Sequence, residues 1–228
     1  LNLSRLRGIF FLKARLSKLL DMINPHCIHS QGFRSDLLVS LFFSNYKFIS
    51  TIHNNPFADY SYKLGNISGS MIAHLHKYCV KKNPNSFIAV SRSILEIYAS
   101  KKIKINYIQN GVDDEYFTSI KPSDKNLLKL KLGIPLDRHI FISSGRLEKS
   151  KNLITTIEGF NKYNQSNSIL LIVGDGSERQ SLENFKREYI HFLGFTDSIV
   201  EYYQLADFFI SSSVTEGFPM AVLESMAV

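Results

Sequence analysis

The chain has 228 residues, of which 44% are hydrophobic and 21% are charged, a balance typical of a folded globular protein. This composition excludes a disordered chain, a collagen-like repeat and a coiled coil. Its two cysteines, Cys27 and Cys79, are too few for a disulfide framework or a four-cysteine zinc site, so a reducing compartment is expected. No apolar run approaches the roughly 20 residues needed to cross a bilayer.

The net charge of +7 is distributed unevenly along the chain. Residues 1–120 carry a net charge of +8, whereas residues 121–228 carry −1. This asymmetry predicts two domains with different partners. The basic half suits an anionic membrane surface or a phosphorylated substrate, and a solvated lysine-rich surface is the alternative. Nucleic acid is not expected as a partner, because the chain has no Arg/Gly-rich run and no zinc knuckle.

The first half begins with an amphipathic pattern over residues 3–23, which predicts a helix that ends at Asn24-Pro25. A helix of this kind can lie on a membrane, but strand-like segments follow at once and favour packing against a sheet. Ser35 and Asp36 are predicted to cap the next helix, and Ser91 a later one. The expected strands cover 27–30, 47–52, 86–90 and 105–108, with helices over 37–43, 60–82 and 94–100 between them.

The pattern weakens after residue 114 and then restarts. We expect a linker over residues 119–125, around Lys121-Pro122-Ser123, between a partial first domain (1–118) and a partial second domain (126–228). Strands then alternate with helices again, with strands over 139–143, 168–173, 190–193 and 208–211 and helices over 152–163, 178–188, 198–205 and from 221 onward. This rhythm predicts the α/β class, with two Rossmann-like units whose parallel sheets carry helices on both faces.

Ligands of such units bind at the carboxyl ends of the strands, and most of the chain's short motifs include or follow such an end. They are IHSQG (28–32), TIH (51–53), AVS (89–91), QNGVD (109–113), SGRL with KN (144–147, 151–152), LIVGDGSER (171–179), FLGF (192–195), AD (206–207) and SSSVTEGFPMAVLE (211–224). The order of these motifs along the chain is hard to obtain by accident. The series resembles glycosyltransferase family 4, the retaining nucleotide-sugar-dependent transferases with the GT-B fold.

The resemblance implies two Rossmann-like domains that face a cleft, and transfer of a sugar from a nucleotide sugar with retention at the anomeric carbon. It implies a front-face process, in which the acceptor hydroxyl attacks from the side that the diphosphate leaves and the departing phosphate takes the proton. The family's first strand with its glycine-rich turn, and the part of its second domain beyond Glu224, have no counterpart here. Both domains are therefore expected to be truncated.

Arg146 and Lys151 lie five residues apart around the loop that follows the strand over 139–143. A rigid guanidinium fork and a mobile ammonium can bind one diphosphate together. Fixed cations there would stabilise the leaving group as the glycosidic bond breaks. Gly145 belongs to the same predicted donor site. A salt bridge between Arg146 and Glu148 is the alternative.

Glu216 and Glu224 flank a loop, Gly217-Phe218-Pro219, that leads into a helix. A helix N-terminus favours anions, and Gly217 lacks the Cβ that would hinder the approach of a diphosphate. The resemblance implies that Glu216 contacts the donor sugar and that Glu224 accepts hydrogen bonds from the ribose hydroxyls. An ordinary pair of surface glutamates is the alternative.

The resemblance also implies that His53 faces the donor sugar, with Arg146, Lys151 and Glu216 as the other catalytic residues. It implies that the turn at Gly174 lines the nucleotide site and that the backbone at Phe195 lies near the base.

No resident cofactor or metal is predicted. The turn after Gly174 lacks the third glycine of a dinucleotide fingerprint, because Arg179 occupies that position. There is no Asp-x-Asp motif, and His26, Cys27 and His29 alternate between the two faces of one strand, so they cannot converge on an ion.

Together these features predict a glycosyltransferase that acts on a glycan or lipid-linked acceptor in polysaccharide or envelope biosynthesis, in the cytoplasm or peripherally at the inner face of the cell membrane. The alternatives are an inactive fragment of such an enzyme and a GT-B-type nucleotide-sugar epimerase, which would need no acceptor.

Overall fold

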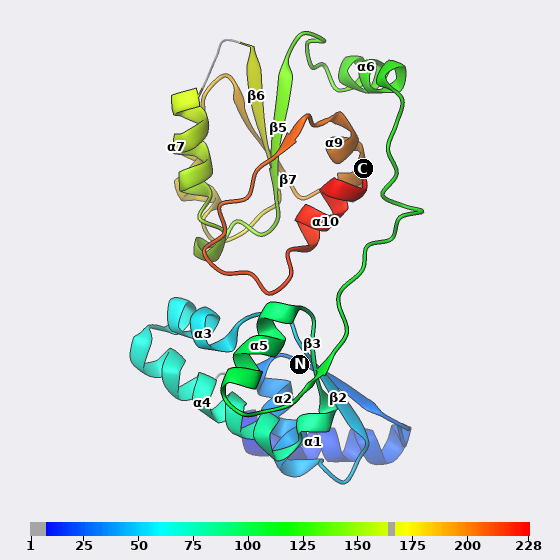
Figure 1. Ribbon diagram of the computed structural model, residues 1–228, viewed down its shortest axis with the longest axis vertical. Coiled ribbons are helices and arrows are strands. Elements are labelled where there is room, and N and C mark those ends of the chain that lie inside the picture. Colours follow the sequence, from blue (N-terminus) through cyan, green and yellow to red (C-terminus); the bar gives the residue numbers. More distant parts are fainter. Residues whose placement is uncertain (1–7, 164–166) are drawn as a thin grey trace. The chain divides into compact units, whose positions relative to one another are not determined.

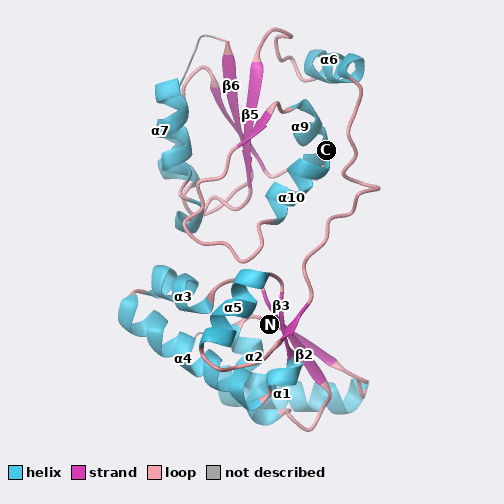
Figure 2. Cartoon of the chain, in the orientation of Figure 1, coloured by secondary structure: helices cyan, strands magenta, loops and turns pink. Residues whose placement is uncertain are grey.

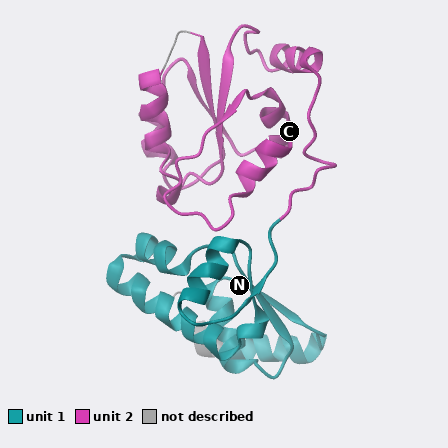
Figure 3. Ribbon diagram, in the orientation of Figure 1, with its two compact units in different colours: residues 1–110 teal, residues 111–228 magenta. Residues whose placement is uncertain are grey.

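The computed structural model describes residues 8–163 and 167–228 (Figure 1), and the chain divides into two compact units, residues 1–110 and 111–228 (Figure 3). Within the described residues, each unit contains a parallel sheet of four strands (Figure 2). The predicted α/β class with two parallel sheets is therefore confirmed. The predicted helix over 3–23 is described from Gly8 onward, and residues 3–7 lie outside the described residues.

Unit 1 (residues 1–110) places its strands in the order β1-β2-β3-β4. Every connection advances in the same direction across the sheet, and crossovers between parallel strands are right-handed. The connecting helices therefore cover one face of the sheet. The sequence predicted helices on both faces, so this prediction is wrong for unit 1. Burial along β2 agrees with one covered face, since Phe48, Ser50 and Ile52 are buried and Ile49 between them is exposed. The elements are α1 Gly8–Ile23, β1 Ile28–Gln31, α2 Phe33–Phe42, β2 Phe48–Ile52, α3 Pro56–Leu64, α4 Asn66–Lys82, the 3-10 turn Pro84–Ser86, β3 Phe87–Ala89, α5 Arg92–Ser100 and β4 Asn106–Tyr107.

Local signals explain where several of these helices begin. The Asn55 side chain accepts hydrogen bonds from the amides of Phe57 and Ala58 and caps α3, and Ser91 caps α5 as predicted. The predicted helix over 60–82 is two helices, because the chain turns at Gly65 with a φ of 81°. The cap predicted at Ser35-Asp36 is wrong, since α2 begins at Phe33 and Asp36 is buried inside the unit.

Unit 2 (residues 111–228) begins its regular structure with α6, which starts at Pro122 inside the stretch expected as a linker. Proline is well tolerated in the first turn of a helix, so the predicted linker at 119–125 is wrong in its second half. Helix α8 is also shorter than the predicted 178–188. The elements are α6 Pro122–Lys131, β5 His139–Ser144, the 3-10 turn Lys149–Lys151, α7 Leu153–Tyr163, β6 Ser168–Val173, α8 Arg179–Glu183, β7 Ile190–Gly194, α9 Ile199–Leu205, β8 Phe208–Phe209 and α10 Met220–Ala227.

The sheet of unit 2 has the order β7-β6-β5-β8, so the direction of the connections reverses at β5. This reversal places α7 on one face and α9 and α10 on the other (Figure 2). Each face has its own apolar core. One core contains Leu147, Leu153, Ile157, Phe160, Leu170, Ile172, Leu182 and Ile190. The other contains Phe117, Ile140, Ile142, Ile169, Leu171, Val173, Tyr203 and Leu205. Doubly wound sheets bind ligands where the strand order reverses, here at the carboxyl ends of β5 and β8.

The loops after β5 and β6 are in backbone contact. The Gly145 amide donates to the Val173 carbonyl at 3.0 Å. Gly174 has a φ of 131°, and a Cβ built on it would lie 1.9 Å from the Gly145 carbonyl oxygen. The backbone alone thus requires glycine at position 174.

We expect Gly174→Ala to lower the free energy of unfolding by about 2 kcal/mol or more, because the new methyl group meets backbone at an unfavourable φ. The matched control is Gly159→Ala in α7, where a Cβ would meet nothing within 4 Å. This control should change the stability by at most about 1 kcal/mol, in the stabilising direction. Urea denaturation followed by circular dichroism checks both, and equal midpoints for the two variants would contradict the close contact.

Candidate functional site

A pocket lies at the position in unit 2 where the strand order reverses. It is lined by Ser143, Ser144, Gly145, Arg146, Lys151 and Leu153 from β5 and the segment after it, by Phe209, Ser211, Ser212, Ser213 and Glu216 from β8 and its loop, and by Pro219, Ala221 and Val222 at the start of α10. The pocket therefore combines two strand ends with a helix N-terminus. Such a combination offers free backbone N–H groups and a positive dipole end to an anion.

Lys151 and Glu216 form an ion pair inside this pocket. The Lys151 Nζ donates to Glu216 Oε1 at 2.6 Å, and the two side chains are 28% and 25% exposed. The sequence predicted both residues for the site, 65 positions apart, and the structure brings them into direct contact. A partly buried pair is screened less by salt than a surface pair.

Ser212 fixes the loops that carry this pair. Its hydroxyl is placed 2.8 Å from the Asn152 carbonyl, 3.2 Å from the Lys151 carbonyl and 2.7 Å from the Thr156 hydroxyl. These contacts tie the loop after β8 to the start of α7. Sequence analysis did not single out Ser212, because a serine within a run of three gives no distinguishing signal.

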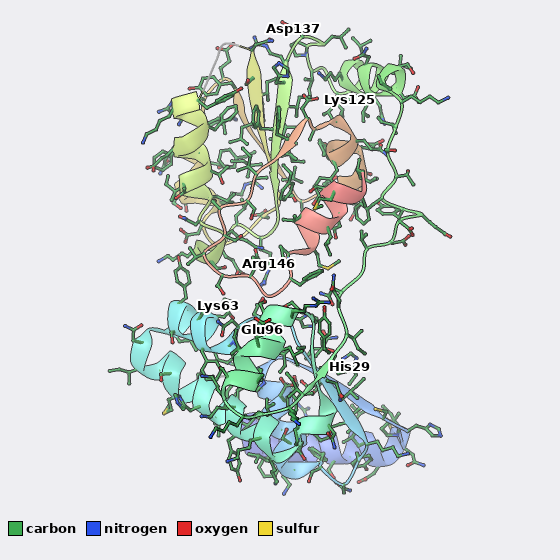
Figure 4. The ribbon with its side chains drawn as sticks, viewed as in Figure 1. His29, Lys63, Glu96, Lys125, Asp137 and Arg146 are labelled. Carbon is green, nitrogen blue, oxygen red and sulfur yellow. The ribbon has the colours of Figure 1, made fainter. Side chains whose placement is uncertain are left out.

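Arg146 lies on the loop after β5 (labelled in Figure 4) and donates from Nη1 to Glu148 Oε1 at 3.0 Å. This is the salt bridge that the sequence left open as an alternative. The Arg146 side chain is 71% exposed, and surface pairs of this kind contribute about 0–1 kcal/mol. The guanidinium can therefore turn toward a ligand at small cost.

Glu224 on α10 does not line the pocket but is connected to it through Tyr203. The Tyr203 hydroxyl donates to Glu224 Oε2 at 3.2 Å and lies 2.6 Å from the hydroxyl of Ser144, which does line it. Burial raises the pKa of Tyr203 well above its usual range, so the phenol stays protonated and remains a donor to Glu224. Tyr203 was missed in the sequence, where it reads as one of several aromatic residues on an amphipathic helix.

Four further residues predicted for the site lie outside the pocket lining. Gly174 packs against Gly145, which does line it. Gly217 is buried and Phe218 half-buried on the segment that leads into α10. Phe195 follows β7 and is 77% exposed. Of the residues predicted for the donor, the pocket thus brings together Gly145, Arg146, Lys151, Glu216 and Pro219.

His53 belongs to unit 1, where it follows β2, is exposed and borders a pocket of its own. Partial desolvation, and then the nearby His29, lower the pKa of His53 below its usual 6.5. The ring is therefore neutral at pH 7 and available as a hydrogen-bond donor or acceptor. The same pocket contains buried polar groups from α2 and α4 that the sequence did not reveal.

Two negative findings hold for residues 8–163 and 167–228. No three His, Cys, Asp or Glu side chains there are grouped so that they could hold a metal ion. None of the helices in these ranges has both the length and the apolar character needed to cross a membrane.

Known proteins resemble this chain in sequence. It is 30% identical over 208 residues to the O-antigen biosynthesis glycosyltransferase WclY of Escherichia coli. The aligned region covers 87% of this chain and 57% of WclY. The chain is 27% identical over 254 residues to the alpha-monoglucosyldiacylglycerol synthase of Acholeplasma laidlawii, covering 99% of this chain and 62% of that enzyme. The chain thus spans about three fifths of the length of these relatives.

Solved structures share the fold. Anabaena Alr3699/HepE, crystallised in complex with UDP-glucose, superposes with a TM-score of 0.79 at 17% identity over 95% of this chain and 60% of HepE. WaaG, a glycosyltransferase involved in lipopolysaccharide biosynthesis, superposes with a TM-score of 0.70 at 11% identity over the whole of this chain and 76% of WaaG.

Two family models together cover most of the chain. Residues 124–228 match the family described as glycosyl transferases group 1, and residues 1–116 match Glycosyltransferase Family 4. The second match alone extends over half of the chain. The chain therefore belongs to glycosyltransferase family 4 and has the GT-B fold of its structural neighbours.

Proposed function

We propose that this chain is the substrate-binding part of a retaining glycosyltransferase, which moves a sugar from a nucleotide sugar to a glycan or lipid-linked acceptor. The observation that carries the proposal is the pocket where the strand order of unit 2 reverses. It combines two cationic side chains, Arg146 and Lys151, with the carboxylate of Glu216 and a helix N-terminus. Cations suit a diphosphate and a carboxylate suits sugar hydroxyls, so one pocket offers partners for both halves of a nucleotide sugar.

Binding of the diphosphate would exchange the partner of Lys151. In the free pocket its ammonium is paired with Glu216 at 2.6 Å. A diphosphate offers the ammonium more negative charge than one carboxylate. Once Lys151 turns toward the phosphate, Glu216 is free to accept hydrogen bonds from the donor sugar.

The same cations serve the chemical step. The leaving diphosphate gains negative charge as the glycosidic bond breaks, and fixed positive groups stabilise that charge more in the transition state than in the ground state. Arg146 and the N-terminus of α10 would add to the effect of Lys151. Such groups act without the paired acid and base that glycosidases require.

The Tyr203–Glu224 pair is suited to the nucleoside. Tyr203 occupies one lone pair of Glu224 Oε2 and so holds the carboxylate in one orientation. The other carboxylate oxygen can then accept from a vicinal diol such as that of a ribose. UDP-glucose is the first donor to test, because HepE was crystallised with it.

We expect Lys151→Met to weaken UDP binding about 10-fold or more, since a charge-assisted hydrogen bond is worth about 1.5–3 kcal/mol. Glu216→Gln should leave the affinity for UDP unchanged or raise it, because it removes the competing partner of Lys151, and should weaken UDP-glucose relative to UDP. Lys162→Met, on the exposed end of α7, is the control and should change neither affinity.

Isothermal titration calorimetry with UDP, GDP and their glucose conjugates measures these affinities. Wild-type affinity for nucleotide in Lys151→Met, or no binding of either nucleotide to the unaltered chain, would overturn the assignment of the pocket. Release of nucleoside diphosphate only when an acceptor is present would separate the transferase from an epimerase.

We also propose that unit 1 contacts an anionic membrane surface. Ile67, Met71, Leu75 and Tyr78 lie on one face of α4 and are 89%, 68%, 40% and 55% exposed. Lys81 and Lys82 extend this stripe at the end of the helix, and Lys63 lies on α3 (labelled in Figure 4), which packs against α4. An exposed apolar stripe with a basic border is typical of interfacial helices.

We expect the double variant Ile67→Ser/Met71→Ser to weaken binding to vesicles that contain phosphatidylglycerol at least 10-fold, because both side chains would lose their burial in the lipid. Leu127→Ser/Leu130→Ser, on exposed positions of α6 in unit 2, is the matched control and should have no effect. Co-sedimentation at low and high salt measures the binding. Binding of the unaltered chain that does not change with salt, or no binding at all, would contradict the proposal.

A further inference from the structure

A network of buried hydrogen bonds in unit 1 connects β1 and β2 to α3. Its centre is Asp36 on α2, which is 1% exposed. The hydroxyls of Ser30 and Ser50 each donate to Asp36 Oδ1 at 2.7 Å. His76 on α4, 3% exposed, places Nε2 3.1 Å from Asp36 Oδ2, and its Nδ1 lies 3.0 Å from the hydroxyl of Tyr60 on α3.

The chemistry of these groups determines which one donates and which one accepts in each hydrogen bond. A carboxylate only accepts hydrogen bonds, so both serines and the Nε2–H of His76 donate to Asp36. In the neutral ring, Nδ1 is then the acceptor, and the hydroxyl of Tyr60 donates a hydrogen bond to it. The phenolic oxygen of Tyr60 keeps its lone pairs for a further partner. Burial, and then the charges of Asp36 and Asp59, raise the pKa of Tyr60, so the phenol keeps its proton.

Asp36, His76 and Tyr60 all border the pocket that contains His53. The pocket has a volume of about 150 Å³, and its other polar lining residues are Thr51, Asn54 and Asp59. Each molecule in liquid water takes up about 30 Å³, so the volume of this pocket corresponds to about five water molecules. Pockets that bury most of a drug-sized ligand measure roughly 300–1,000 Å³, so this smaller pocket suits one hydroxyl-bearing edge of a ligand.

The lining indicates which class of ligand fits. No Lys or Arg is among the described residues that line the pocket, and the charge of Asp59 is compensated by Lys63 at 3.2 Å. A phosphate would find no cation at this lining, whereas hydroxyl groups would find acceptors and donors. Phe33 adds an apolar wall, with its ring centroid 5.9 Å from that of Tyr60. Polar groups beside an aromatic wall suit a neutral sugar.

We propose that Tyr60 is a specificity-determining residue that accepts a hydrogen bond from a hydroxyl of the acceptor sugar, and that Asp36 and His76 are positioning residues that fix the orientation of its phenolic oxygen. This inference rests on the proposed function, because it assigns this pocket to the acceptor of that transfer. A purely structural cross-link between the sheet and three helices would need the same bonds but would not respond to a sugar.

The test uses the full chain with ¹⁵N-labelled histidine and follows the Nδ1 resonance of His76 by NMR. The probes are the methyl glycosides of glucose, galactose and N-acetylglucosamine at millimolar concentration. We expect at least one glycoside to shift this resonance, because a new bond to the Tyr60 oxygen changes the hydrogen bond that its hydroxyl donates to His76.

Tyr60→Phe should abolish the shift and raise the dissociation constant of that glycoside at least threefold. Tyr98→Phe is the matched control, since Tyr98 is fully buried in the same unit and its hydroxyl has no partner among the described residues. This control should keep both the shift and the affinity. His76→Gln, which retains an amide donor toward Asp36 but removes the acceptor for Tyr60, should weaken the glycoside as Tyr60→Phe does.

The inference would be overturned if none of the glycosides shifts the His76 resonance, or if Tyr60→Phe binds the glycoside as tightly as Tyr98→Phe does. UDP titration of the same samples separates this failure from a failure of the proposed function. Nucleotide binding without a glycoside response would remove the role of Tyr60 and leave the transferase assignment intact.

Discussion

The candidate site of unit 2 depends on one constraint, the reversal of strand order at β5. Because β6 and β8 lie on opposite sides of β5, the loops after β5 and β8 diverge and leave space between them. Few contacts then define that space. Gly174 lets the loop after β6 support Gly145, and Ser212 ties the loop after β8 to the start of α7. The side chains that could meet a nucleotide sugar project from loops whose backbone is fixed in this way.

Unit 1 uses a different solution. Its strands advance in one direction only, so the topology provides no reversal point. Its pocket lies instead between the end of β2 and helices α2, α3 and α4, and a buried carboxylate organises it. A buried charge is costly unless it is hydrogen-bonded. Three donors from two strands and one helix satisfy Asp36, and this requirement fixes the register of the elements around the pocket.

The sequence predicts the strands well because buried parallel strands are short apolar runs bounded by glycine and polar residues. It also identifies Lys151 and Glu216, because both follow strands and stand in motifs that resemble a family. It does not reveal the Asp36–His76 contact, since these residues are 40 positions apart and each has a common local explanation. Asp36 resembles a helix cap, and His76 occupies one position of a polar helix. The prediction of a linker at Pro122 fails for a related reason, because proline is common both in linkers and in the first turn of a helix.

Under the proposed function, the ion pair of the unit 2 pocket would link recognition of the two parts of a donor. While Lys151 is bound to Glu216, neither group is fully available, and a ligand with a sugar but no phosphate must compete with the ammonium for the carboxylate. A bound diphosphate would supply the ammonium with a new partner and release the carboxylate in the same step. Nucleotide binding should therefore precede or accompany recognition of the sugar. Free sugars, which cannot supply that charge, would be disfavoured at this pocket by the same pair that a nucleotide sugar would rearrange under the proposed function.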